Sequence, residues 1–272
     1  MMPQYLFNNK NGGWDKILNK IISCERIILF LDYDGTLVPI KKLPALAIIS
    51  IKQIKILKNL IKSKNVFPIL VSGREYSDIK RLVPIKNLII ASNHGFRITN
   101  GRENWIHPKA KALLPEIKKI LRALKLKLKS FPGAMVEDKK ITITVHHRNA
   151  KISSVPAIKE IVEEIIKPAS SKLKLTEGKK VFEIKPNIRW NKGEAVTRIL
   201  KIERLRKKGA IIVYIGDDKT DEDAFKKLDG RGITIRVGYS GNSSAKYFVK
   251  NTNEVRKFLE TIESVNNIKD KQ

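Results

Sequence analysis

The sequence LFLDYDGTLVPI, residues 29–40, contains the end of an apolar run followed directly by two aspartates, Asp32 and Asp34. The apolar residues from Ile27 to Phe30 predict a strand that is covered on both faces. Asp32 and Asp34 follow it, and side chains two positions apart in an extended segment project to the same side. Such residues can simply start a turn. They can also form a site, since ligands of open α/β sheets bind beyond the carboxyl ends of the strands.

The composition indicates a folded globular protein. A chain of 272 residues can bury a sizeable core in one large or two modest domains. No apolar run approaches the roughly 18 residues that cross a bilayer, and the N-terminal segment lacks the apolar core of a signal peptide. Cys24 is the only cysteine, which excludes an internal disulfide and suits a reducing compartment. We therefore expect a cytoplasmic protein without a membrane partner.

The formal net charge of +28 favours anionic partners such as nucleic acid or small phosphorylated molecules. The lysines are spread over nearly every segment, so they also fit a merely solvated surface. Aromatic residues make up only 7 %, and they form no alternating aromatic and basic run that would stack on bases. Charge alone does not choose a function.

Both ends of the chain alternate strands with helices, which predicts a parallel sheet with right-handed crossovers. The expected elements of the first part are strands at 26–33, 66–72 and 88–92, and helices at 47–64 and 75–82. From Asn191 the pattern resumes with a helix over 192–207, strands at 210–216 and 232–238, and helices from about 220 and over 252–265.

The middle of the chain has a different pattern, which predicts a separate domain. Helical spacing marks 107–130 and 154–167, and a period of two over 134–148 indicates a half-exposed antiparallel sheet. Short strands are expected at 172–176 and 181–185. We assign 1–101 and 186–272 to a discontinuous α/β core, and 102–185 to an inserted α+β cap. A cleft between two such bodies is a usual place for a small-molecule site.

Acidic residues follow two of the core strands. Asp32 and Asp34 repel each other unless a proton or a cation lies between them, and Mg²⁺ prefers such oxygen ligands. The segment GDDKTDED, residues 216–223, supplies a second cluster. Thr220 and Asp223 resemble a helix-capping arrangement, but capping does not account for the two aspartates that precede them. A cation shared by both strand ends would require such a cluster.

Other strand and helix ends suit a phosphate group. Ser72 offers a hydroxyl and Gly73 an unobstructed backbone N–H, although an ordinary turn with a helix-capping serine has the same residues. Lys192 opens a helix, where the helix dipole disfavours a cation unless an anion is held nearby. Asn191 and Glu194 around it resemble a capping box.

Taken together, the sequence DxDGT, then SGR, a helix-opening lysine and GDDxTDE resembles the haloacid dehalogenase-like (HAD) phosphohydrolase superfamily. The resemblance implies an α/β fold: a HAD-like Rossmannoid parallel-sheet core with an inserted α+β cap. The segments GDDKTDEDAF, SNHGF and VFEIKP before NKGEA look like the trehalose-6-phosphate phosphatase family, over about residues 26–250. That family implies a phosphoric monoester hydrolase of trehalose biosynthesis, which forms an aspartyl-phosphate and releases trehalose and phosphate. We expect it to act on a small-molecule sugar phosphate and to be a monomer.

The resemblance also implies roles for the residues at the strand ends. Asp32 becomes the nucleophile and Asp34 the general acid and base. The groups that hold the phosphoryl oxygens are Ser72, Gly73 and Lys192. The implied Mg²⁺ ligands are the Asp32 carboxylate, the Asp34 backbone carbonyl and Asp217, with Asp218 and Asp221 acting through water or as supports.

Sugar recognition is assigned by local motif match to seven charged or polar residues: Arg74, His94, Glu137, Lys139, Arg148, Lys179 and Glu183. Charged groups suit vicinal hydroxyls, because charge-assisted hydrogen bonds are stronger than neutral ones. Outward charges are also the ordinary state of an exposed sheet face, and a histidine often only hydrogen-bonds its own loop. The alternatives are a phosphatase for sucrose 6-phosphate or a glycosyl-phosphoglycerate, and a basic nucleic-acid-binding protein that has the fold without catalysis.

Overall fold

The computed structural model describes residues 2–8, 13–178, 180–202, 205 and 208–269. The chain divides into two compact units, a core of Met1–Trp105 with Trp190–Gln272 and a cap of Ile106–Arg189. Both boundaries lie four residues beyond the positions that the sequence suggested. The first is shifted because the chain adds a further short strand, Asn104–Ile106, to the core sheet after Gly101. No helix in the described part of the chain is both long and apolar enough to span a membrane.

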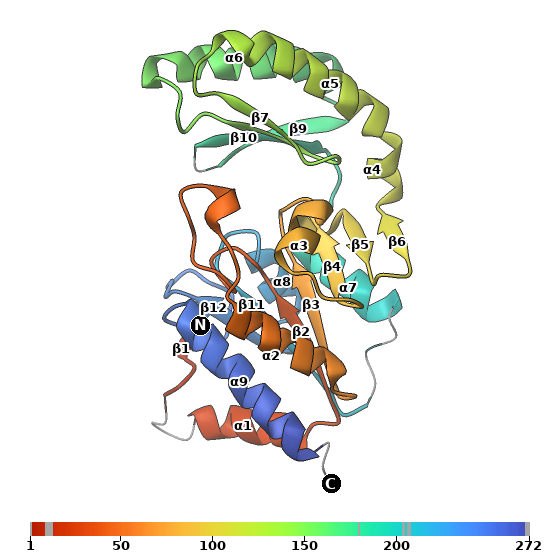
Figure 1. The fold of residues 1–272 in the computed structure, drawn as a ribbon, viewed down its shortest axis with the longest axis vertical. Helices are drawn as coiled ribbons and strands as arrows, with labels where there is room; N and C mark the ends of the chain where they lie inside the picture. Colours follow the sequence, from red (N-terminus) through yellow and green to blue (C-terminus); the bar gives the residue numbers. More distant parts are fainter. Residues whose placement is uncertain (1, 9–12, 179, 203–204, 206–207, 270–272) are drawn as a thin grey trace. The chain divides into compact units, whose positions relative to one another are not determined.

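The core is built on a sheet in which nine strands are described (Figure 1). Their order is β1 (Gln4–Tyr5), β13 (Tyr247–Val249), β12 (Ile233–Val237), β11 (Ala210–Gly216), β2 (Arg26–Leu31), β3 (Val66–Val71), β4 (Ile89–Ser92), β5 (Arg97–Thr99) and β6 (Asn104–Ile106). The neighbours from β1 to β4 are parallel, and β5 is antiparallel to β4. The carboxyl ends of β2, β3, β4 and β11 therefore share one edge.

Helices cover both faces of this sheet (Figure 1). One face packs against α1 (Gly13–Ser23), α2 (Ile51–Lys62), α3 (Tyr76–Leu82) and α9 (Thr252–Lys269), and the other against α7 (Lys192–Ile202) and α8 (Glu222–Lys227). Ile27 and Leu29 enter the first cluster, whereas Ile28 and Phe30 enter the second. The prediction that this strand is covered on both faces is confirmed.

Side-chain caps set where α2 and α7 begin. The Ser50 hydroxyl accepts a hydrogen bond from Gln53 N at 3.2 Å, so α2 begins later than the apolar spacing suggested. Asn191 Oδ1 caps α7 by accepting from Glu194 N at 3.0 Å. The Glu194 carboxylate instead pairs with Lys227 at 2.9 Å. The expected cap at Thr220 is wrong, because α8 begins at Glu222.

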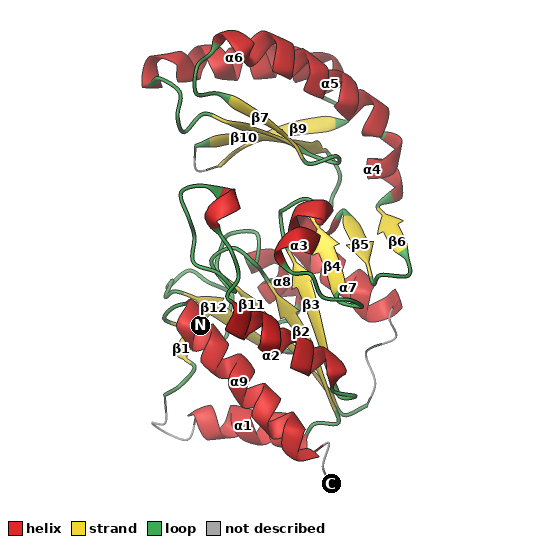
Figure 2. Ribbon diagram, viewed as in Figure 1, coloured by secondary structure: helices red, strands yellow, loops and turns green. Residues whose placement is uncertain are grey.

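In the described part of the cap, a four-stranded antiparallel sheet is covered on one face by α5 (Leu114–Lys127) and α6 (Val155–Ile166) (Figure 2). The strand order is β7 (Met135–Asp138), β8 (Ile143–His146), β10 (Val181–Pro186) and β9 (Leu173–Gly178). A further helix, α4 (Pro108–Ala112), comes before α5, so the long helix expected over 107–130 is interrupted at Leu113. Short 3₁₀ turns lie at Pro44–Leu46, Asn93–Gly95, Leu128–Ser130, Ile152–Ser154 and Lys167–Ala169.

Candidate active site

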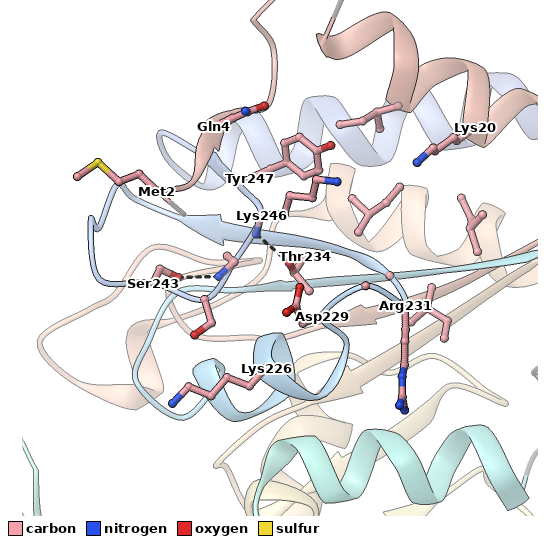
Figure 3. Close-up of a pocket in the computed structure, with 18 of the residues that line it drawn as sticks. Met2, Gln4, Lys20, Lys226, Asp229, Arg231, Thr234, Ser243, Lys246 and Tyr247 are labelled. Carbon is pink, nitrogen blue, oxygen red and sulfur yellow. Dashed lines mark hydrogen bonds between the residues drawn. The ribbon is translucent and has the colours of Figure 1, made fainter.

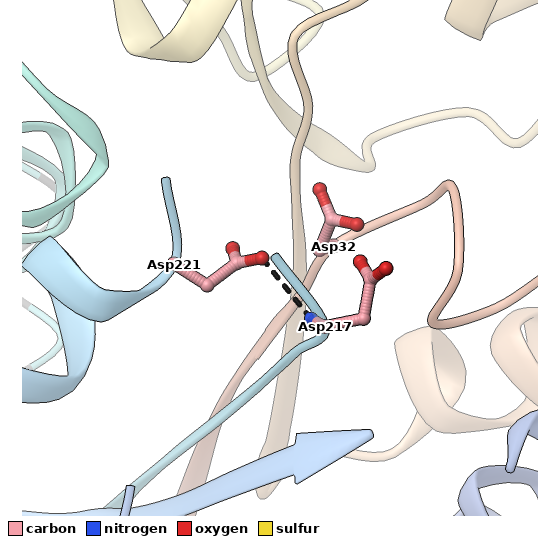
Figure 4. Close-up of side chains that lie close together, drawn as sticks. All are labelled: Asp32, Asp217 and Asp221. Carbon is pink, nitrogen blue, oxygen red and sulfur yellow. Dashed lines mark hydrogen bonds between the residues drawn. The ribbon is translucent and has the colours of Figure 1, made fainter. Parts of the chain in front are cut away.

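Three carboxylates from different segments meet at the carboxyl edge of the core sheet. Asp32 follows β2, Asp217 follows β11, and Asp221 lies just before α8 (Figure 4). Each offers an oxygen that lies within 4.8 Å of the other two. They meet because β2 and β11 are parallel neighbours, and Asp32 N donates to Ile215 O at 3.0 Å. At Gly35, with φ of 80°, an added Cβ would collide with the Asp217 carboxylate, so this approach requires glycine.

Lys192 from the start of α7 supplies the positive charge of this cluster. Its Nζ donates to Asp32 Oδ1 at 2.7 Å and to Asp221 Oδ1 at 2.8 Å, and the residue is only 2 % exposed. Burial by itself lowers the pKa of Lys192, but the carboxylates of Asp221 and Asp32 outweigh burial, so the net shift is upward. The lysine therefore stays protonated beside the end of β2.

Both carboxylate oxygens of Asp221 accept hydrogen bonds from neighbouring groups of the cluster. Its Oδ1 accepts from Lys192 and from the Tyr214 hydroxyl at 2.8 Å, and its Oδ2 accepts from the backbone N of Asp217 and of Asp218, both at 3.1 Å. Four donors on one fully buried carboxylate agree with a supporting role. Sequence reasoning missed Tyr214, although a tyrosine in a buried strand signals a hydrogen-bond partner for its hydroxyl.

Asp32 and Asp217 retain the oxygens that a metal ion would use. Among the described residues no donor reaches Oδ2 of Asp32 or either carboxylate oxygen of Asp217. Burial, and then the charges of Asp221 and Asp217, raise the pKa of Asp32 well above its usual value despite Lys192. Burial and the charges of Asp221 and Asp218 raise the pKa of Asp217 to about 7. Because a divalent cation would relieve this repulsion, the donor set fits Mg²⁺.

Asp218 lies on the exposed side of the cluster. Its Oδ1 accepts from Thr220 N at 2.7 Å and from the Thr220 hydroxyl at 2.6 Å. Burial raises the pKa of Asp218, but Lys192 and the Thr220 hydrogen bonds outweigh it, so the net shift is downward. An ionised carboxylate beside the triad suits the supporting role that was predicted for Asp218, and that role stays a prediction.

The loop after β3 carries Ser72 and Gly73, and it meets His94 in the 3₁₀ turn after β4. Ser72 O accepts from His94 N at 2.9 Å, and the Ser72 hydroxyl accepts from Arg74 N at 3.2 Å. His94 has φ of 56°, a left-handed conformation, and an added Cβ on Gly73 would lie 2.6 Å from its ring. The His94 ring therefore packs directly on the glycine whose N–H was expected to bind phosphate. Phosphate binding by Ser72 and Gly73 stays a prediction.

Arg74 and Asp34 form an ion pair instead of standing as separate binding groups. Nε of Arg74 donates to Asp34 Oδ2 at 2.6 Å, and Nη2 donates to Asp34 Oδ1 at 2.7 Å. Arg74 is 7 % exposed, whereas Asp34 is partly exposed. The sequence motifs did not suggest this pairing, because the two residues follow different strands.

The cap residues that were predicted to bind sugar gather on the helix-free face of the cap sheet. Glu137 of β7 and Glu183 of β10 lie in one cross-strand row on either side of Thr144. Glu137 Oε2 lies 2.7 Å from His146 Nε2 and 4.0 Å from Lys139 Nζ. Sequence reasoning missed His146 and Thr144, whose period-two spacing in β8 places them on this face.

Two cap predictions need separate statements. Arg148 is exposed in the turn after β8. Lys179 lies outside the described residues. Sugar binding by both stays a prediction.

A cavity of about 830 Å³ lies at the opposite, amino-terminal edge of the core sheet (Figure 3). Its wall includes the starts of β11, β12 and β13 and the basic side chains of Lys20, Lys226, Arg231 and Lys246. Four of its nineteen lining residues are basic, which is also the proportion of Lys and Arg in the whole chain. The charge of this cavity is therefore that of the composition and does not mark an anion site.

Comparison with solved structures shows the fold of the core. A haloacid dehalogenase-like hydrolase from Bacteroides thetaiotaomicron superposes with a TM-score of 0.59 at 16 % identity, over 88 % of this chain and 99 % of that one. The core with its acidic strand ends is thus a HAD-like fold, as the motifs implied.

The comparisons then give the family. The family model described as Trehalose-phosphatase matches residues 30–253. Trehalose-phosphate phosphatase B of Arabidopsis thaliana is 36 % identical over 263 residues, covering 92 % of this chain and 69 % of the relative. A solved structure described as a trehalose-6-phosphate phosphatase related protein has a TM-score of 0.77 at 28 % identity, over 89 % of this chain and 99 % of that one. The chain belongs to the trehalose-phosphatase family.

Proposed function

We propose that this protein is a Mg²⁺-dependent phosphatase that hydrolyses trehalose 6-phosphate to trehalose and phosphate. The observation that carries the proposal is the meeting of Asp32, Asp217 and Asp221 around the buried Lys192 at one edge of the sheet. A phosphate ester is anionic and repels a carboxylate nucleophile, so its charge has to be neutralised before attack. Lys192, together with a cation held by the carboxylates, would neutralise this charge next to Asp32.

The ion would be held by Asp32 Oδ2, Asp217 and the Asp34 backbone carbonyl, with Asp221 fixing Lys192 and the 217–218 turn. When bound, Mg²⁺ would supply charge stabilisation for the phosphoryl oxygens. Lys192, the Gly73 N–H and the Ser72 hydroxyl would bind the same oxygens. The ordered contacts of Asp221 give this arrangement its rigidity.

We expect hydrolysis to proceed in two steps. An Asp32 oxygen attacks phosphorus, the bond from phosphorus to the sugar oxygen breaks, and Asp34 donates its proton to the leaving oxygen. Asp34 then takes a proton from water, the water oxygen attacks phosphorus, and the bond from phosphorus to Asp32 breaks to release phosphate. Asp32 and the protonated Asp34 are regenerated, so one water is consumed in each cycle.

The residues that would bind the sugar are, in the cap, Glu137, Lys139, Arg148, Lys179 and Glu183. In the core, His94 would bind it. Carboxylates and ammonium groups make charge-assisted hydrogen bonds to sugar hydroxyls. We further propose that the protein acts as a monomer in the cytoplasm, where the thiol of the buried Cys24 stays reduced. Gel filtration with light scattering tests the oligomeric state.

The direct test is phosphate release from a panel of sugar phosphates, with Mg²⁺ and with EDTA. The panel contains trehalose 6-phosphate, sucrose 6-phosphate and a glycosyl-phosphoglycerate. Asp32→Asn is compared with Asp229→Asn, a matched change of a surface carboxylate at the opposite edge of the sheet. We expect a preference for trehalose 6-phosphate that is lost with EDTA and with Asp32→Asn but kept with Asp229→Asn.

The other outcomes are equally informative. Comparable release from several esters would retain the chemistry and reject the substrate. An absence of metal-dependent release from every ester would reject the enzyme, and salt-dependent retention on DNA would then favour the nucleic-acid-binding alternative.

A further inference from the structure

The Arg74 guanidinium grips the Asp34 carboxylate in a two-pronged ion pair. The donor-to-acceptor distances are 2.6 Å from Nε to Oδ2 and 2.7 Å from Nη2 to Oδ1. Parallel hydrogen bonds from one planar group fix both the position and the tilt of a carboxylate. Each Asp34 oxygen keeps one further direction, which can accept a hydrogen bond in the ionised form or carry the proton that the acid form donates, so the pair orients the group without blocking either role.

Arg74 is itself held from the side opposite to Asp34. Its Nη1 donates to Asp78 Oδ2 at 3.1 Å, and Nη2 also donates to Pro44 O at 2.8 Å. The guanidinium carbon lies 5.3 Å from the centre of the Tyr33 ring. Four of the five N–H groups of the guanidinium are therefore engaged within the core, which leaves little capacity for a sugar.

The contacts continue into α3. The second Asp78 oxygen, Oδ1, accepts from Arg81 Nη2 at 2.7 Å. Arg81 is exposed, whereas the Arg74 side chain is only 8 % exposed. Asp34, Arg74, Asp78 and Arg81 thus form a chain of alternating charge that runs from the end of β2 to the surface of α3. We call it the charge chain.

We propose that the charge chain positions Asp34 for proton transfer, with Arg74 as its positioning residue rather than a sugar ligand. The inference rests on the proposed function, because it concerns the group that gives a proton to the sugar oxygen. A carboxyl displaced by about 1 Å can cost on the order of a hundredfold in rate. In this proposal, Arg74 positions Asp34 instead of binding the sugar, which was the role suggested by the motif match.

Two substrates separate orientation of the acid from other roles. Trehalose 6-phosphate has an alcohol leaving group that needs a proton, whereas the p-nitrophenolate released from p-nitrophenyl phosphate does not. With Arg74→Met we expect kcat for trehalose 6-phosphate to fall about a hundredfold with little change in KM. With p-nitrophenyl phosphate we expect one equivalent of nitrophenolate in a first turnover near the wild-type rate. Slow turnover follows, because Asp34 also activates the water.

Four further variants grade the effect. Asp34→Asn should reproduce the pattern of a fast first turnover followed by slow release. Asp78→Asn should show the same pattern with a smaller loss, because it removes one support of Arg74. Arg81→Gln, at the exposed end of the charge chain, should show the smallest loss of the series, because solvent already screens its pair with Asp78. Arg74→Lys should rescue little, because an ammonium cannot reproduce the two parallel bonds.

The outcomes that overturn the inference are specific. A rise in KM for trehalose 6-phosphate alone would make Arg74 a sugar contact. An equal loss on both substrates, first turnover included, in variants whose thermal unfolding matches wild type would leave Arg74 a structural role only. If Arg74→Met unfolds, Asp78→Asn decides by the same criterion. Wild-type protein that releases no phosphate from either ester rejects the proposed function, and the inference falls with it.

Discussion

The acidic edge of the core sheet and the helix-free face of the cap sheet both carry carboxylates beside basic side chains, but they hold them differently. In the core, Asp32, Lys192 and Asp221 are each at most 5 % exposed, and their bonds are 2.7 and 2.8 Å long. In the cap, Glu183 and Lys185 are part-exposed and their charged atoms lie 3.5 Å apart. The core buries its charges among one another, whereas the cap leaves its charged pairs part-exposed, including Glu137 with His146 at 2.7 Å.

This difference separates chemistry from specificity in physical terms. A buried charge without a partner is costly, so each member of the core cluster depends on the others. A part-exposed pair contributes little to stability, so its residues can change with the sugar at small structural cost. Mutations in the two regions should therefore differ in kind as well as in size.

The largest effect is expected from Lys192→Met. The change leaves Asp32 and Asp221 buried without their cation, which should lower the free energy of unfolding by about 3–5 kcal/mol and abolish phosphate release. Urea unfolding and the phosphate assay measure both. Lys185→Met is the cap control and should cost less than about 1 kcal/mol. Equal destabilisation by the two changes would contradict the conclusion that the core charges depend on their partners more than the cap charges do.

The next effect is the pH dependence of the metal-free protein. The folded-state pKa of Asp217 is about 7, above its usual value near 3.8, so the folded state binds the extra proton between these values. Stability should therefore fall as pH rises from 4 to 7, by up to about 1.4 kcal/mol per pH unit. Because the metal needs the ionised carboxylate, Mg²⁺ should remove this fall and bind more tightly as pH rises.

Thermal melts from pH 5 to 8, with EDTA and with Mg²⁺, measure this dependence. Asp217→Asn should reduce the slope of the EDTA series without abolishing it, because the raised pKa of Asp32 acts in the same direction. A metal-free protein that grows more stable toward pH 8 would contradict the prediction.

A smaller and different effect is expected from Glu183→Gln and Glu137→Gln. Loss of one charge-assisted hydrogen bond to sugar costs at least about 1.5 kcal/mol, so KM for trehalose 6-phosphate should rise roughly tenfold or more. Stability and the rate with p-nitrophenyl phosphate should not change, because neither residue touches the phosphoryl group. Steady-state kinetics on both substrates test this, with Glu177→Gln in β9 as the control. Loss of activity on both substrates would place these residues in the chemistry instead.

The smallest effect is expected from Lys159→Ala. Lys159 is part-exposed and pairs with Glu177 at 2.7 Å and with Glu163 at 3.8 Å. Solvent and salt screen such pairs, so neither the urea midpoint nor kcat should change measurably. A clear loss of stability would show that surface pairs in this lysine-rich chain matter more than their geometry indicates.

Much of the fold follows from local patterns. The apolar run before Asp32 defined β2, and the change of period after Gly101 marked the cap. The short outer strands β1, β13, β5 and β6, two at each end of the sheet, escaped prediction, since each has only two or three residues and gains its stability from a neighbouring strand. The interruption at Leu113 and the late start of α2 were missed because apolar spacing does not locate helix ends.

The sequence by itself determined which kinds of group stand at the ends of the strands, because glycines, aspartates and a helix-opening lysine each have a local physical meaning there. Only the tertiary structure decided which of them meet. It joined Lys192 to Asp32 across 160 positions, turned Tyr214 onto Asp221, and paired Arg74 with Asp34. These contacts depend on strand order and register, which bring distant residues to one edge, and no local pattern of residues encodes that order.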